Sequence, residues 1–576
     1  MTRKASQSAQ PHELGEKLLR LMASGSHSGQ KGRRIGLVQL WSSIGKPGLA
    51  NLGIVALLSA TCGTVVLYLL NAEAREVEYH GYSRLMAFGF LLLLIIYRWA
   101  QNYLIREATQ AIEMALHDRR IATADDVLNL SLEDIQEVGL RGVMDGVGAH
   151  YSALSQTLVP IIAGAEGLVL LLFMFAYLVV LSPLAALLTT IVVVLTVAGF
   201  LTSRGLLDDD MRRATEAEEK YREITEGLVR GAKELSLNPA RSRDFYDDIQ
   251  ARSEKLAAAR SNAAAHFAGM LATGNSASYL MAGSVVFIMP LIASDASTDI
   301  SRIMIAVIFL LGPISAVVQT FQQVTTAQYA LSEIDAFQTR VAGLSVRHQH
   351  ESGPDAAEPF SKLELVKLSY RHGGDQGFAI TDIDFHLTRG EIVFMTGGNG
   401  SGKTTMLRAL TGLYPRRSGE ILLNGMATPL YPMQGYRNLF STVFADFHVF
   451  PEPYGLDEAG LERFEHWLNV LDIRAKFGAD LRTIDPGALS TGQKKRLGLA
   501  LALAEDRQIL ILDEWAADQD PETRRRFYRR ILPELREAGK TILAATHDEQ
   551  YFDCCDRRVH MTTGRLNHEV NDEPNQ

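Results

Sequence analysis

The chain has 576 residues, a formal net charge of −9 at pH 7 and three cysteines. So modest a charge gives no indication of a nucleic-acid-binding surface, and three cysteines are too few for a disulfide framework. The first half is very apolar and the second half is charged, which favours a membrane domain followed by a soluble one. The N-terminal stretch MTRKASQSAQPHELGEKLL has no apolar core, so we do not expect a cleaved signal peptide.

The segment before Lys46 is polar and basic, and six long apolar runs follow it. Within that segment, Ile35–Trp41 has the amphipathic pattern of an interfacial helix or of a soluble helix end. The six runs have about the twenty residues that a bilayer requires. They are Leu49–Leu70, Leu85–Ile105, Leu158–Val180, Leu184–Leu201, Phe267–Ala293 and Ile303–Gln323. Buried core helices are the alternative, but six such runs in one half favour membrane spans.

The links between these runs predict how the chain is oriented in the membrane. Two of them, Arg106–Thr157 and Thr202–His266, are long, charged and patterned as helices, whereas the others are short. The segment from Arg204 to Arg260 contains twelve Lys and Arg residues, and the segment from the N-terminus to Lys46 contains eight. Because positive residues collect on the cytoplasmic side, we expect the N-terminus, both long links and the second half there.

After a polar, Gly- and Pro-containing stretch near residues 341–360, the pattern changes to alternating strands and helices, which is typical of an α/β domain. Its most specific motif lies in Glu391–Leu410, EIVFMTGGNGSGKTTMLRAL, where a strand leads into a glycine-rich loop and a helix. The matching residues are Gly397, Gly398, Asn399, Gly400, Ser401, Gly402, Lys403 and Thr404, followed by Thr405. A ligand-free surface loop is the alternative, but the register of Lys403 and Thr404 predicts a nucleoside triphosphate site.

The chemistry of this loop follows from its residue types. Successive backbone N–H groups and the start of the helix face the phosphates. Lys403 reaches the β- and γ-phosphates, and the Thr404 hydroxyl is a ligand for Mg²⁺. The run Ile509–Leu512 predicts a buried parallel strand that ends in two carboxylates. Of these, Asp513 is expected to hold Mg²⁺ through water and Glu514 to act as general base on the attacking water.

The stretch Leu489–Arg496, LSTGQKKR, resembles the L-S-G-G-Q signature of ABC transporters, with Thr491 in place of the first glycine. Together with six spans and two long cytoplasmic links, it makes the chain resemble an ABC exporter. The resemblance implies a membrane all-α domain of six transmembrane helices and an α/β ABC nucleotide-binding domain. The expected boundaries are a cytoplasmic segment at 1–45, the membrane domain at 46–340, a linker at 341–360 and the ATP-binding domain at 361–576.

The resemblance also assigns roles to residues around the nucleotide. Ser490, Gly492 and Gln493 would form a second anion site that closes on ATP held by the phosphate loop of another subunit. One chain carries one loop and one signature, so the resemblance implies a homodimer, with a heterodimer as the alternative. Tyr370 would stack on the adenine ring, and Asp520 would contact the partner subunit.

In the same family, His547 would bond the γ-phosphate and support Glu514. Tips of the two long links, near Asn129–Gly139 and Glu234–Phe245, would dock onto nucleotide-binding domains.

One position departs from the family pattern. Ala445, in FSTVFADFHVF, stands where ABC domains usually carry a glutamine that senses the γ-phosphate and Mg²⁺. The following residue, Asp446, is the expected substitute. Polar residues in the spans are candidates for a substrate path or for hydrogen bonds between helices. They are Arg98, Asn102, Asn275, Tyr279, Gln319, Gln322 and Gln323.

The segments LSTGQKKR, LDEWAADQDP, VFADFHVF and GAKELSLN resemble the cyclic-peptide exporter branch of the family, which includes exporters of pyoverdine-type siderophores, lipopeptides and microcin-like peptides. This implies ATP-driven export of such a peptide across a bacterial inner membrane. One alternative is an importer of metal–siderophore complexes on the same fold. Another is a nucleotide-gated regulator that transports nothing, which intact Lys403, Asp513, Glu514 and His547 disfavour.

Overall fold

A computed structural model of the chain describes residues 46–79, 84–292, 300–345, 360–372, 377–428, 434–478 and 480–568. The expected interfacial helix at Ile35–Trp41 lies outside these residues, as does most of the expected linker. The described parts of the chain form two compact units. One draws on Met1–Ala124 and Met144–Gln338, and the other on Asp125–Val143 and Thr339–Gln576.

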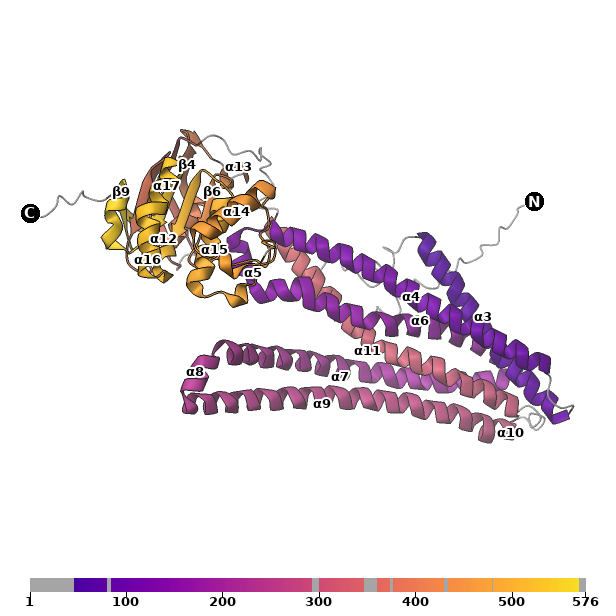
Figure 1. Cartoon of the computed structure of the whole chain (residues 1–576). Coiled ribbons are helices and arrows are strands. Elements are labelled where there is room, and N and C mark those ends of the chain that lie inside the picture. The colour runs from indigo at the N-terminus through magenta and orange to yellow at the C-terminus, as the bar shows by residue number, and fades with distance from the viewer. Residues whose placement is uncertain are drawn as a thin grey trace, which may run out of the picture. The chain divides into compact units, whose positions relative to one another are not determined.

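The first unit consists of long helices (Figure 1). They are α3 (Lys46–Tyr79), α4 (Arg84–Leu128), η1 (Asp145–Ala149), α6 (His150–Leu181), α7 (Pro183–Arg230), α8 (Ala232–Leu237), α9 (Pro239–Gly283), η2 (Ser284–Ile288), α10 (Met289–Ile292) and α11 (Ile300–Ser345). Every expected span falls within these helices, apart from Ala293, which lies outside the described residues. Helices are the natural form of such runs, because a bilayer core offers backbone groups no water to bond.

Within the described residues, five helices are long and apolar enough to cross a membrane. They are Ala50–Glu73, Arg84–Leu128, Leu132–Leu181, Pro239–Ile292 and Ile300–Leu344. The fourth expected span, Leu184–Leu201, lies at the start of the continuous helix α7, where Pro183–Gly199 is an apolar stretch among the described residues. The remainder of α7 is charged and continues as part of a long link.

Small and polar side chains hold the apolar helices together. A Cβ added at Gly164 of α6 would lie 1.9 Å from Thr320 Oγ1 of α11, so the two helices meet closely at this glycine. The same hydroxyl donates to the Pro160 carbonyl at 2.9 Å. Between α3 and α6, the Ser59 hydroxyl donates to the buried Glu166 carboxylate at 2.7 Å.

The second long link forms the hairpin of α7 and α9, which lie side by side and are joined by α8 (Figure 1). Arg260 of α9 pairs with Glu218 of α7 at 2.9 Å. Helical structure is interrupted between α8 and α9 at Asn238. Its side chain accepts hydrogen bonds from the first backbone N–H groups of α9. This interruption lies within the expected docking tip Glu234–Phe245.

The second unit contains two sheets. In the described residues, the larger has the order β10-β9-β3-β8-β7-β6 and the smaller, antiparallel one the order β2-β1-β4-β5. The strands are β1 (Lys362–Arg371), β2 (Ala379–Thr388), β3 (Ile392–Thr396), β4 (Ser418–Leu423), β5 (Met426–Ala427), β6 (Phe440–Val443), β7 (Ile509–Asp513), β8 (Thr541–Ala545), β9 (Arg557–Thr562) and β10 (Arg565–His568).

The larger sheet separates two apolar clusters. Phe394 of β3 points into a cluster formed with α14 (Glu458–Val470) and α15 (Thr491–Ala504), whereas its neighbour Val393 points into a cluster formed with the smaller sheet and α12 (Lys403–Leu410). The alternation of side chains along a strand explains this division. Burial on both sides fixes the parallel strands, and their carboxyl ends therefore meet at one edge.

The first expected docking tip belongs to this second unit. Helix α5 (Leu132–Met144) includes a non-helical residue, Gly139, with φ 77°. Glu133 of α5 pairs with Arg417 at 2.9 Å, and Gln136 accepts a hydrogen bond from the Tyr414 hydroxyl at 3.2 Å. These contacts confirm that the first long link docks on the α/β domain.

Replacing Gly164 with alanine is expected to destabilise the membrane unit by about 1–3 kcal/mol, because the added methyl group must displace Thr320. Thermal unfolding in detergent measures the effect. Gly312→Ala on α11 is the matched control, since a Cβ there meets no described atom within 4 Å beyond its own helix. Equal unfolding temperatures for the two variants would show that α6 and α11 do not pack as described.

Candidate functional site

The phosphate loop lies between the end of β3 and the start of α12. Gly402 has φ 106°, in the region that favours glycine, and it brings Lys403 to the first position of the helix. Lys403 is 5% exposed, and its Nζ donates to the Gly397 carbonyl at 2.9 Å and to the Gly398 carbonyl at 3.3 Å. The loop and the helix start therefore present backbone N–H groups and one ammonium to an anion.

Three residues from distant parts of the sequence converge beside this loop. The Glu514 carboxylate lies 3.4 Å from Lys403 Nζ and 3.4 Å from His547 Nε2. Lys403 Nζ and His547 Nε2 are 3.1 Å apart. Each residue follows the carboxyl end of a buried parallel strand or the loop after it, which explains why they meet. A carboxylate placed here is in position to take a proton from water that attacks a terminal phosphate.

The backbone of Glu514 has a conformation that residues other than glycine rarely adopt, with φ 52° and ψ 34°. Two contacts hold it. Its N–H donates to the Ala545 carbonyl at 3.0 Å, and its carbonyl accepts from Lys495 Nζ at 2.8 Å. Such backbone strain gathers at functional sites and persists only where neighbouring contacts fix it.

Thr404 and Asp513 form the part of the site that fits a metal ion. The Thr404 hydroxyl donates to Asp513 Oδ2 at 2.7 Å. Asp513 Oδ1 is buried and has no hydrogen-bond partner among the described residues. Burial raises the pKa of the Asp513 carboxyl, an effect that the Thr404 hydroxyl partly offsets. An unsatisfied carboxylate oxygen beside a hydroxyl matches the oxygen ligands that Mg²⁺ prefers.

The signature segment begins α15. Ser490 and Gln493 cap this helix reciprocally, because each side chain bonds the backbone N–H of the other. A Cβ added at Gly492 would lie 2.7 Å from the Asp518 carbonyl, so this position requires glycine. Gln519 also donates to the Gly492 carbonyl at 3.1 Å. The start of the signature helix is therefore fixed to the loop that follows Glu514.

A buried lysine that the sequence analysis did not identify strengthens this connection. Lys495 is 5% exposed, and besides the Glu514 carbonyl its Nζ contacts Asp518 Oδ2 at 2.6 Å. The Trp515 indole donates to the Lys495 carbonyl at 2.7 Å. The lysine stands within the recognised motif, but no spacing rule links it to Asp518. Its role becomes visible only when the two segments pack together.

The part of the site expected to bind the adenine ring is not open in the way that the sequence predicts. Tyr370 is 1% exposed, its pKa is raised by burial, and its ring stacks on Tyr414 with centroids 4.7 Å apart. With its ring buried against Tyr414, its role of stacking on adenine stays a prediction. Phe378 is 43% exposed, and its Cζ would lie 3.0 Å from a Cβ at Gly402. It is an exposed aromatic residue beside the phosphate loop.

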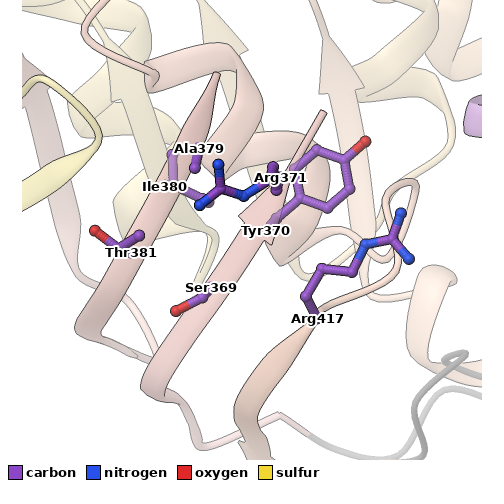
Figure 2. Close-up of a pocket in the computed structure, with 7 residues that line it drawn as sticks. All are labelled: Ser369, Tyr370, Arg371, Ala379, Ile380, Thr381 and Arg417. Atoms are coloured by element: carbon purple, nitrogen blue, oxygen red, sulfur yellow. The ribbon is translucent and has the colours of Figure 1, made fainter. Parts of the chain in front are cut away.

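A cavity of about 430 Å³ lies between β1, β2 and the start of β4. Its lining residues are Ser369, Tyr370, Arg371, Ala379, Ile380, Thr381 and Arg417. Figure 2 shows Tyr370 and Arg417 on one side of the view and Thr381 on the other. Ile380, whose Cγ2 would lie 3.0 Å from a Cβ at Gly402, connects this cavity to the phosphate loop.

Other predicted residues take local roles in one chain. Asp520 caps α16 (Pro521–Arg526) by accepting from the Thr523 N–H at 2.9 Å, which lowers the pKa of its carboxyl. Its contact with a partner subunit stays a prediction. Both oxygens of Asp446 accept from Arg408 Nη2 at 2.8 Å, and its role as substitute for the glutamine stays a prediction.

The seven polar span residues are all partly or fully exposed in the single chain. This leaves both a substrate path and contacts with other helices open to them.

Comparisons with known proteins agree with this geometry. Residues 380–517 match the family model described as ABC transporter. The ATP-binding protein SyrD of Pseudomonas syringae pv. syringae is 30% identical over 548 residues, which cover 91% of this chain and 94% of that protein. The energy-coupling factor transporter ATP-binding protein EcfA1 of Thermotoga maritima is 34% identical over 215 residues, or 36% of this chain and 80% of that protein.

A solved structure supports the fold. It is described as the structure of a bacterial Atm1-family ABC exporter with ATP bound, and it aligns with a TM-score of 0.71 at 16% identity. The alignment covers 91% of this chain and 94% of that one. Both the helical unit and the α/β unit therefore have the fold of an ABC exporter.

Replacing Phe378 with alanine is expected to raise the KM for ATP about tenfold, since loss of base stacking on an aromatic ring costs about 1–3 kcal/mol. The kcat should change little, because stacking on the base contributes to ATP binding whereas Glu514 carries out the proton transfer. Steady-state hydrolysis measures both constants, and Tyr370→Leu is the comparison. If Tyr370→Leu raised the KM and Phe378→Ala did not, Tyr370 would be the base platform after all.

Lys495→Met is expected to lower kcat about tenfold with little change in KM, because an unpaired Glu514 carbonyl lets the general base shift and about 1.4 kcal/mol corresponds to tenfold in rate. Lys494→Met, one residue away, is the control and should behave as the parent protein. A change in KM alone would argue against a role for Lys495 in placing Glu514.

Proposed function

The chain belongs to the ABC transporter family and has the exporter-type half-transporter fold, and from this premise we propose that two copies use ATP to export a peptide across a bacterial inner membrane. ATP hydrolysis coupled to transport follows from the family. The proposal itself is that the chain forms a homodimer, carries a peptide, lies in the inner membrane and has its nucleotide-binding domain in the cytoplasm. The expected class of cargo is a cyclic peptide, a peptide siderophore or a lipopeptide.

The observation that carries the proposal is the convergence of Lys403, Glu514 and His547 on the phosphate loop. Each group has the chemistry that its place requires. Lys403 binds phosphate oxygens, Glu514 accepts the proton of the attacking water, and His547 holds the Glu514 carboxylate and reaches the γ-phosphate. A regulator that does not hydrolyse ATP would not require a carboxylate base, a lysine and a histidine at the same phosphate site.

Thr404 and Asp513 are the residues that would hold Mg²⁺. When bound, this ion neutralises charge on the β- and γ-phosphates. The unsatisfied Asp513 oxygen supports the assignment, because a buried carboxylate oxygen otherwise lacks a partner.

The signature supports the need for a second copy. Ser490 and Gly492 start a helix that is fixed to the loop after Glu514, and the chain has one phosphate loop and one signature. In our proposal, each ATP lies between the phosphate loop of one copy and Ser490 of the other. ATP can then drive closure, since it binds the closed pair better than the open one.

Export of a peptide rests on the resemblance of four segments to the cyclic-peptide exporter branch, together with the exporter-type fold. The chain also has the predicted asymmetry of positive residues, which orients its α/β domain to the cytoplasm. Uptake of metal–siderophore complexes on the same fold is the second candidate function, and the direction of transport separates the two.

Glu514→Gln is expected to lower ATP hydrolysis at least about 100-fold, the usual contribution of a general base, while ATP still binds. Hydrolysis and nucleotide binding by the full-length protein in lipid nanodiscs measure the two effects. Glu522→Gln, an exposed change on α16, is the control. Unchanged hydrolysis in Glu514→Gln would remove Glu514 from the role of base.

Inside-out vesicles test the direction and the cargo. With ATP, the parent protein should accumulate a labelled cyclic peptide, lipopeptide or pyoverdine-type peptide in the lumen, and Glu514→Gln should not. ATP-driven loss of a preloaded metal–siderophore complex from these vesicles would instead support import. Failure with every peptide of the panel, despite ATP hydrolysis, would contradict the peptide proposal.

A further inference from the structure

An ion pair joins the phosphate-loop helix to the segment that lacks the expected glutamine. Arg408 of α12 donates to both oxygens of Asp446, at 2.8 Å each. The Arg408 side chain is 15% exposed and lies over the rings of Tyr414 and Phe444, at 5.7 and 5.6 Å from their centroids. A guanidinium that lies over two rings and also donates from Nη1 to Tyr414 has a restricted direction, so a shift of Asp446 must be followed by Arg408 or break the pair.

Both elements that the pair joins touch the nucleotide site. Helix α12 starts with Lys403 and Thr404, which belong to the phosphate and metal positions. Asp446 lies three residues after Val443, the last residue of β6, which is in register with Leu512 of β7 next to Asp513. A change in what Asp513 and Thr404 hold therefore acts on both partners of the Arg408–Asp446 pair.

The other side of Arg408 leads to α5, the part of the first long link that belongs to the second unit. Arg408 Nη1 donates to the Tyr414 hydroxyl at 3.1 Å, and that hydroxyl donates to Gln136 Oε1 at 3.2 Å. The Tyr414 ring cannot turn freely, because it stacks on the buried ring of Tyr370. Gln136 lies on α5, which the chain connects to α4 on one side and α6 on the other.

We propose that Asp446, Arg408 and Tyr414 form a relay that passes the state of the nucleotide site to α5, in place of the glutamine absent at position 445. The methyl group of Ala445 can neither donate nor accept a hydrogen bond, and the relay begins one residue later with a charged group. Its three members are positioning residues, because none touches the phosphates. The inference rests on the proposed function, since it explains how ATP would act on the membrane helices.

The full-length protein in nanodiscs tests the relay. In a variant in which Cys62, Cys554 and Cys555 are replaced, a spin label at Val180→Cys, an exposed position at the end of α6, reports the distance between two copies. Vanadate trapping after ATP and Mg²⁺ should change this distance in the parent protein. Trapped nucleotide and hydrolysis rate are measured in the same samples.

Two minimal changes interrupt the relay. Tyr414→Phe removes one hydroxyl and keeps the ring that stacks on Tyr370, and Asp446→Asn removes the charge that holds Arg408. Both should trap nucleotide and hydrolyse ATP within about threefold of the parent, yet lose at least half of the distance change. Asp553→Asn, which breaks a surface pair with Arg529, is the control and should show the full change.

Different failures have different meanings. A full distance change in both Tyr414→Phe and Asp446→Asn would overturn the relay. Loss of trapping together with the distance change would also overturn it, because the pair would then support nucleotide binding rather than transmit its effect. A parent protein that traps no nucleotide would contradict the proposed function, and the relay with it.

Discussion

The parallel alignment of β3, β8 and β7 is the constraint on which the site depends. Met395 of β3 and Asp513 of β7 are both in register with Ala545 of β8, so three strand ends stop at one edge of the sheet. The loops that leave this edge carry Lys403, Glu514 and His547. The strands are buried on both faces, which makes their register costly to change. The packed sheet thus brings together a phosphate-binding loop, a carboxylate base and a histidine that lie far apart in the sequence.

Two buried or half-buried cations extend this arrangement in different directions. Lys495 fixes the signature helix to the backbone of Glu514. In the proposed dimer, the base of one ATP site and the anion site offered to the other would therefore move together. Arg408 connects the same region to α5 through Tyr414. Each cation satisfies several acceptors at once, which is why burial of its charge is tolerated.

Sequence alone located the phosphate loop, the paired carboxylates and the buried strands, because fixed spacing and apolar runs encode them directly. It also placed the spans, and the fourth, Leu184–Leu201, lies within α7. It did not find Phe378, Lys495 with Asp518, or Arg408 with Asp446. These contacts join positions that no periodicity relates, and the burial of Tyr370 depends on Tyr414, which only the packed domain brings close.

The central claim is that each ATP site is shared between two copies, and mixed dimers test it directly. Lys403→Ala disables a phosphate loop and Ser490→Arg disables a signature, and differently tagged copies allow each mixed dimer to be purified. With one change on each copy, a shared arrangement leaves one intact site, and vanadate should trap about one nucleotide per dimer. With both changes on one copy and none on the other, no intact site remains and trapping should be lost. The reverse result, trapping only when both changes lie on one copy, would show that each site is complete within a single chain.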